Sequence, residues 1–218
     1  APQGLLFIGA NSVSRTIAKE LKKNGFEVML ADSYRTNVRQ ARMEGLKVFH
    51  GNPVSRLAEK ELDLVGIGRM LGLSQNDDLN LLAVQRYTRE FGKKRVYALS
   101  SQASQRKSDR EKISEELVGV VLFSEDATYS KLASLVAQGA EMRTTNISEE
   151  FTFEDYLEKY GNKAIPMFLL DSRKRLSILS GLPSADQVPA GSRIVALVKA
   201  ERVVEKIEEK KQDAAKAQ

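Results

Sequence analysis

The alternation of short apolar runs with amphipathic segments is the feature that most constrains the fold of this 218-residue chain. Six apolar runs recur about every 20 to 25 residues, and helical periodicity follows most of them. They lie at residues 5–8, 26–31, 46–49, 70–73, 95–99 and 120–123. Parallel strands need crossover connections of this length. The predicted fold class is therefore α/β, a doubly wound, parallel, six-stranded Rossmann-like sheet covered by helices on both faces.

The pattern changes after Met142. Four strand-like segments follow with one short helix between the first two: strands at 143–151, 164–170, 175–179 and 194–198, and a helix at 154–160. About sixty residues are too few for an independent substrate domain. We expect a nucleotide-binding domain at 4–140, a small α+β, β-rich appendage at 141–200, and a charged helical or disordered tail at 201–218.

Two helices in the first part have readable local signals. Asn52 followed by Pro53 predicts a helix start, with asparagine as the N-cap and proline at the first helical position. The helix at 78–91 should turn Leu82, Ala83 and Phe91 toward the core.

Composition narrows the function classes. The chain has no cysteine and one histidine, His50, so disulfides and thiolate sites are excluded, and we expect neither a metal site nor catalytic residues. No apolar run is long enough to span a bilayer, and no signal peptide is expected at the start. The net charge of +5 is mild. Residues 86–112 are locally basic, which suits a solvated or lipid-facing surface better than nucleic acid.

The segment between the first strand and its helix is the main candidate site. Gly9-Ala10-Asn11-Ser12-Val13-Ser14 occupies the place of a G-x-G-x-x-G turn, in which helix N-terminal amides bind phosphate. Asn11 replaces the second glycine and Ser14 the third. Asparagine tolerates positive φ, so the turn can still form.

Asp32 ends the second apolar run, where a carboxylate can accept hydrogen bonds from ribose hydroxyls and repel a 2′-phosphate. Other polar residues follow the second, third and fourth strands and are expected at the same edge of the sheet. Asn52 is interpreted either as a contact to the base or as a helix cap. The predicted cofactor-binding residues are Gly9, Ala10, Asn11, Ser12, Val13, Ser14, Asp32, Ser33, Asn52, Ser74, Gln75 and Asn76. The expected ligand is NAD(H) or AMP, ADP or ATP, and NADP is not expected.

With these residues in place, residues 4 to about 140 resemble the RCK or TrkA-N family of cytosolic regulators of potassium channels and cation transporters. The resemblance is carried by Leu-Phe-Ile-Gly-Ala at 6–10, Asp32, Gly51-Asn52-Pro53 and Gln75-Asn76-Asp77-Asp78-Leu79-Asn80. More narrowly, several segments are similar to the C-terminal region of NhaP-type sodium or potassium/proton antiporters. These are Ala41-Arg42-Met43-Glu44-Gly45, Asp63-Leu64, Gly66-Ile67-Gly68-Arg69, Glu90-Phe91-Gly92, Ile165-Pro166-Met167-Phe168 and Pro189-Ala190-Gly191.

The resemblance implies a regulatory domain that follows an antiporter membrane domain, pairs with a second copy as a homodimer, and lies at the cytoplasmic face of the cell membrane. Two alternatives stay open. An NAD-dependent oxidoreductase would need a proton donor near the nicotinamide. His50 is expected on the adenine half of the sheet instead, which disfavours this alternative. A vestigial nucleotide site would leave only a dimerisation scaffold. His50 is either a pH sensor or a structural residue.

Overall fold

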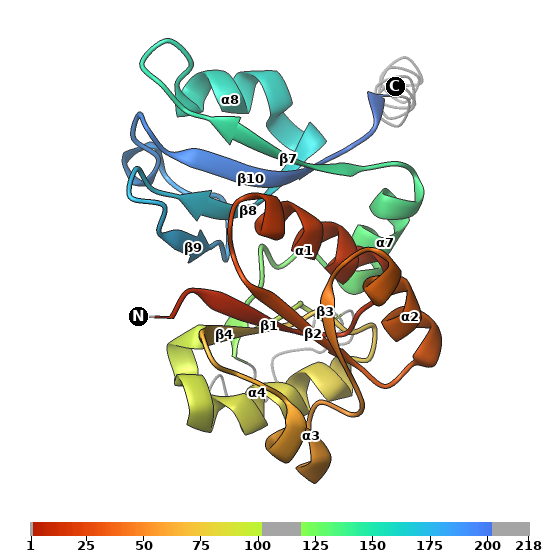
Figure 1. Ribbon diagram of the computed structural model, residues 1–218. Helices are drawn as coiled ribbons and strands as arrows, with labels where there is room; N and C mark the ends of the chain where they lie inside the picture. Colours follow the sequence, from red (N-terminus) through yellow and green to blue (C-terminus); the bar gives the residue numbers. More distant parts are fainter. Residues whose placement is uncertain (1, 102–118, 202–218) are drawn as a thin grey trace, which may run out of the picture.

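The computed structural model describes residues 2–101 and 119–201, and its first part is a parallel six-stranded sheet, here called sheet A (Figure 1). The strand order is β3-β2-β1-β4-β5-β6. The strands are β1 (Gly4–Ile8), β2 (Val28–Asp32), β3 (Lys47–His50), β4 (Ile67–Gly72), β5 (Val96–Ala98) and β6 (Val120–Val121). This topology confirms the predicted doubly wound α/β class.

Helices cover both faces of sheet A because its central strands are apolar on both sides. Those of the first part are α1 (Ser12–Lys23), α2 (Arg35–Met43), α3 (Arg56–Glu61), α4 (Asp77–Phe91) and α7 (Tyr129–Ala137). Buried residues of α1, α2 and α7 share one apolar cluster with β1, and α3 and α4 share another on the opposite face. Short 3-10 turns lie at Lys93–Arg95, Gly161–Lys163 and Ala185–Gln187. Among the described residues, no helix is long and apolar enough to cross a membrane.

The second part is a four-stranded antiparallel sheet, sheet B, which confirms the predicted β-rich appendage. Its order is β7-β10-β8-β9, with β7 (Glu141–Asn146), β8 (Ala164–Leu170), β9 (Leu176–Ile178) and β10 (Arg193–Val198). Helix α8 (Phe153–Tyr160) covers its outer face. Figure 1 shows α1 between the two sheets, with sheet B and α8 beyond it.

Sheet B shares its inner apolar face with the first part of the chain. Alternate residues of β10 separate the two faces: Val195 joins the cluster of α1 and β1, whereas Ile194 packs under α8. Phe168 of β8 meets Phe123, just after β6, edge to face, with ring centroids 5.5 Å apart. One continuous core therefore links the two sheets.

A polar contact joins α1 to β7 at the edge of this core. Thr144 Oγ1 donates to Glu20 Oε1 over 2.7 Å and accepts from Asn24 Nδ2 over 2.9 Å. Both partners lie at the C-terminal end of α1, so that end is attached to sheet B while the N-terminal end faces the edge of sheet A.

Three local predictions were wrong. Helix α3 begins at Arg56 with Ser55 as N-cap; Asn52 Oδ1 instead accepts from Val54 N in a tight turn before the helix. Leu82 is 51% exposed, because α4 turns Asn80, Ala83 and Tyr87 inward. The strand expected at 143–151 ends at Asn146, where a turn closed by Ser148 and Phe151 begins. The tail at 202–218 lies outside the described residues.

Because Phe168 is fully buried between the sheets, Phe168→Ala should lower the free energy of unfolding by about 3–5 kcal/mol. Urea unfolding followed by circular dichroism measures this change. Leu182→Ala, at a 64% exposed position, is the matched control and should change it by less than about 0.5 kcal/mol. A loss below about 1 kcal/mol for Phe168→Ala would contradict the shared core.

Candidate functional site

The site lies where the direction of the strand order reverses, between β1 and β4. The chain leaves β1 toward β2 on one side, and β4 continues to β5 on the other. The carboxyl ends of β1 and β4 therefore meet at the edge where such sheets bind ligands. Two predicted segments come together there, since Asn11 Nδ2 donates to the Leu73 carbonyl over 2.8 Å.

Gly9 makes the turn out of β1. Its φ is +99°, and a Cβ at this position would lie 3.2 Å from the Cα of Ser74. A side chain would be strained by both the backbone conformation and the neighbouring loop. The first glycine of the predicted turn is thus required by close approach of the two loops.

Asn11 stabilises the loop rather than leaving it open. Its Oδ1 accepts from Ser14 N over 3.0 Å, which makes it the N-cap of α1, while its Nδ2 holds the end of β4. Ser14 is fully buried, and its hydroxyl donates back to the Asn11 carbonyl over 3.1 Å. The two residues that replace glycines therefore cross-link the turn.

The first amides of α1 remain available. Within the described part of the chain, no acceptor is recorded for the backbone N–H of Asn11, Ser12 or Val13. Ser12 is exposed, whereas Val13 is only 1% exposed, so the helix meets solvent at its first residue. Consecutive amides at a helix N-terminus can bind an anion, since they carry the positive end of the helix dipole.

Asp32 lies beside this turn with only 7% of its surface exposed. Its Oδ2 accepts from Ala10 N over 2.7 Å and from Asn37 Nδ2 over 2.9 Å, and its Oδ1 accepts from Tyr34 N over 2.8 Å. A carboxylate offers about four acceptor positions. Three are used within the chain, which leaves room for one further donor at Oδ1. Ser33 beside it is exposed.

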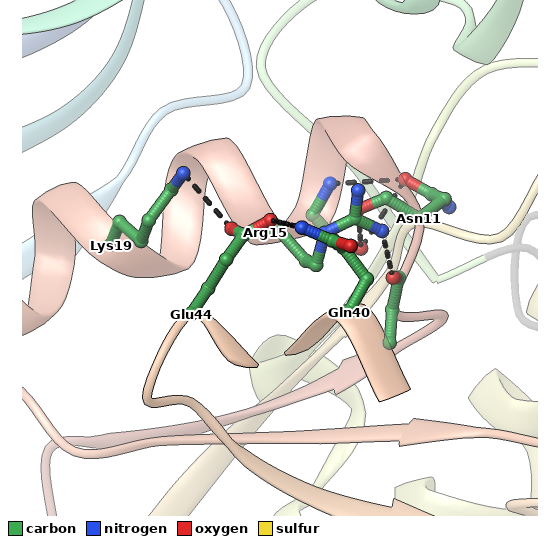
Figure 2. Close-up of polar contacts among 7 residues, drawn as sticks. Asn11, Arg15, Lys19, Gln40 and Glu44 are labelled. Atoms are coloured by element: carbon green, nitrogen blue, oxygen red, sulfur yellow. Dashed lines mark hydrogen bonds and ion pairs between the residues drawn. The ribbon is translucent and has the colours of Figure 1, made fainter. Parts of the chain in front are cut away.

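A partly buried charge network fixes the loop from the side of α1 (Figure 2). Arg15 Nη1 donates to the Ala10 carbonyl over 2.7 Å, and its Nε contacts Glu44 Oε1 at 3.1 Å. Glu44 also pairs with Lys19 at 2.9 Å and accepts from Gln40 at 3.0 Å. Burial alone would raise the pKa of Glu44, but these partners outweigh it and hold the pKa below its ordinary value of 4.5.

Helix α7 brings one more side chain to the site. Burial raises the pKa of Tyr129, while the charge of Arg15 lowers it and that of Asp32 raises it. The phenol therefore lies within electrostatic reach of both groups. Tyr129 is distant in sequence from the other site residues, and no local motif marks it; Arg15 and Glu44 were also missed, because each looks like an ordinary surface charge in the sequence.

The remaining predicted residues lie at the same edge with structural contacts of their own. Ser74 and Asn76 build the turn into α4: Ser74 Oγ accepts from Asn76 N, and Asn76 caps the helix. The buried Asn80, absent from the predicted set, clamps Ser74 through two hydrogen bonds to its backbone. Gln75 and Asn52 are exposed. Residues 2–101 and 119–201 contain no group of three or more His, Cys, Asp or Glu suited to a metal ion.

A Rossmann-type sheet, a tight turn, open amides at a helix N-terminus and an acidic residue at the end of β2 define a nucleotide-binding class of fold. The TrkA-N domain family matches residues 5–121, more than half of the chain. The chain belongs to this family. A comparison with curated proteins gave no match.

Three solved structures show more distant likeness. The NAD(P)-binding domain of an exopolyphosphatase-related protein from Archaeoglobus fulgidus is 20% identical, with a TM-score of 0.44 over 62% of this chain and 94% of that one. The GsuK RCK domain is 11% identical, with a TM-score of 0.44 over 94% of this chain and 46% of that one. The GsuK channel bound to NAD is 13% identical at the same score, and the match covers 91% of this chain and 38% of that chain.

Removing the Asn11 side chain should destabilise the protein. Asn11→Ala loses the cap of α1 and the bridge to Leu73, so we expect about 1–2 kcal/mol less stability in urea unfolding. Asn11→Ser keeps a capping oxygen and should recover about half of the loss. Equal stability of wild type and Asn11→Ala would show that the bridge contributes nothing.

The lowered pKa of Glu44 predicts a pH-dependent contribution to stability. Ionised Glu44 stabilises the fold fully above its ordinary pKa, and this contribution is lost as pH falls through the lower folded value. The stability difference between wild type and Glu44→Gln should therefore be about 1–2 kcal/mol near neutral pH and shrink as the pH falls below the ordinary pKa of 4.5. Glu149→Gln, at an exposed loop position, should show no such difference. A gap that grows on acidification would contradict the assignment.

Proposed function

We propose that this chain is the cytosolic regulatory domain of a monovalent cation (Na⁺ or K⁺)/proton antiporter, and that it binds NAD(H) or an adenine nucleotide. The observation that carries the proposal is the set of three open amides at the start of α1 beside Asp32, at the reversal point of sheet A. Membership of the TrkA-N family supports a regulatory rather than an enzymatic role, and the antiporter rests on the sequence resemblance.

In the proposed complex, the amides of Asn11, Ser12 and Val13 receive a phosphate at the positive end of α1. The remaining acceptor position of Asp32 Oδ1 takes one ribose hydroxyl. The negative charge of Asp32 repels a 2′-phosphate, so NADP should bind more weakly than NAD. Asn52 and Gln75 are exposed at the same edge and supply polar contacts to the base and linking groups.

Regulation requires that the ligand favour one arrangement of a pair of domains. The contacts of α1 suggest how this arises, because its N-terminal end contacts the ligand while Glu20 and Asn24 at its other end bind sheet B. In the proposal, the chain acts as a homodimer attached to the membrane domain at the cytoplasmic face. Changing a two-state gate from 1:99 to 99:1 requires about 10⁴-fold preference for one state.

A second candidate is a dimerisation scaffold whose nucleotide site is closed. The observation that favours it is the extent of internal hydrogen bonding at the turn: Asp32 already accepts three hydrogen bonds, and both ends of the Asn11 amide are engaged. Under this alternative the loop needs no ligand to be stable, and nucleotides should not bind.

The two candidates are separated by a thermal-shift panel with NAD⁺, NADH, NADP⁺, AMP, ADP and ATP on wild type and two Ser12 variants. Ser12→Pro removes one open amide at the first helical position, where proline is well accommodated. Asn11 has φ −73° and ψ 179°, an extended conformation that a following proline favours. The variant should therefore fold, and Ser12→Ala keeps the amide as the matched control.

We expect a ligand at a hundred times its Kd to add about 2.7 kcal/mol, a shift of several degrees in wild type and Ser12→Ala. Ser12→Pro and Asp32→Ala should lose most of it. Absence of any shift in wild type would favour the scaffold. An undiminished shift in Ser12→Pro would show that the nucleotide does not bind at the start of α1.

A further inference from the structure

A basic groove lies on the outer edge of sheet A and shares no residue with the site described above. It has a volume of about 460 Å³ and is lined by one face of α2 and the end of β3: Arg35, Val38, Arg39, Arg42, Met43 and His50. The buried Val38 forms its floor, and the arginines and His50 are exposed. This volume is within the range of small-molecule sites.

The charge of the groove is uncompensated. No ion pair is recorded in the described part of the chain for Arg35, Arg39 or Arg42, and no acidic residue lines the groove. The nearby Glu44 is engaged by Arg15, Lys19 and Gln40. On the neighbouring strand, by contrast, Lys47 pairs with Glu27.

The position of these charges also disfavours the helix that carries them. Helix α2 begins with Arg35, lacks a side-chain cap and has no acidic residue in its first turn, so the charge of Arg35 opposes the helix dipole, whereas Arg42 in the last turn is favourably placed. Arg35 and Arg39 are like charges one turn apart, which destabilises an isolated helix by a few tenths of a kcal/mol. A bound anion would relieve both effects.

The arginine side chains of the lining favour phosphate as the bound anion. A guanidinium binds phosphate in a two-pronged geometry that lysine does not offer. Arg35 to Arg42 spans about 10 Å along the helix axis, enough to contact more than one phosphate group. His50, at the end of the edge strand β3, adds a further donor to the lining.

We propose that this groove binds a soluble ligand with clustered phosphate groups, held by Arg35, Arg39, Arg42 and His50. The concave shape favours a small ligand over a membrane surface, since the lining side chains come from two elements that face a common volume. The lining residue Met43, 72% exposed, offers an apolar contact to the rest of such a ligand.

The test is isothermal titration of the 218-residue chain with inorganic triphosphate, in parallel with co-sedimentation on phosphatidylglycerol and phosphatidylcholine vesicles. We expect triphosphate to bind and Arg39→Gln to weaken it about tenfold or more. Arg173→Gln, which removes the same charge from an exposed turn in sheet B, should have no effect. Ser12→Pro should bind triphosphate like wild type.

Two outcomes would overturn the proposal: no binding of triphosphate by wild type, whether or not anionic vesicles bind, or equal affinity of Arg39→Gln. A loss of triphosphate binding in Ser12→Pro would assign the phosphate to the start of α1 instead. The nucleotide panel on Arg39→Gln keeps the two sites apart, because the nucleotide shift should persist there whether or not triphosphate binds.

Discussion

The burial of α1 between two sheets is the constraint on which the rest of the structure depends. Val13, Ile17 and Leu21 lie on one face of this helix and are almost fully buried in the cluster that also contains residues of sheet B. Burial of an apolar side chain of this size contributes about 1.5–3 kcal/mol. The helix therefore cannot shift without disturbing both sheets, which holds its N-terminus at the edge of sheet A.

The polar contacts at that edge explain how the turn tolerates the loss of two glycines. In a glycine-rich turn the backbone approaches the ligand because side chains are absent. Here the side chains of Asn11 and Ser14 instead point into hydrogen bonds with the loop and with β4, and the amides of Asn11, Ser12 and Val13 stay open. The same loop geometry is thus reached by cross-linking, and the positive end of the helix remains exposed to solvent.

Paired and unpaired charges divide the surface of α2 into two sides. On the side facing α1, Glu44 forms ion pairs with Arg15 and Lys19. Arg15 in turn donates to the Ala10 carbonyl and so fixes the loop. On the outer side, three arginines line a groove without a carboxylate. Internal pairing suits a structural role, whereas uncompensated charge in a concave surface suits a ligand of opposite sign.

Much of the fold could be predicted from the sequence, because a strand buried on both faces must be a continuous apolar run. The segments at 5–8 and 164–170 became β1 and β8 within one residue for this reason. Helix ends were less predictable where two capping residues compete, because Asn52 and Ser55 are both good N-caps. Pro53 is buried and its carbonyl accepts a hydrogen bond from Tyr87, so the helix begins after Ser55 instead. Leu82 was misplaced because α4 buries a polar residue, Asn80, on its inner face.

The candidate site likewise has features that could be predicted from the sequence and features that could not. By itself the sequence determined the class of fold, the turn at Gly9 and the placement of Asp32 at a strand end, since these follow from periodicity and local backbone preference. Only the tertiary structure decided that Asn11 bridges to Leu73, that Arg15 and Glu44 secure the loop, and that three arginines share a groove with His50. Such contacts join residues far apart in the chain, and they depend on strand order and helix packing, which local patterns do not encode.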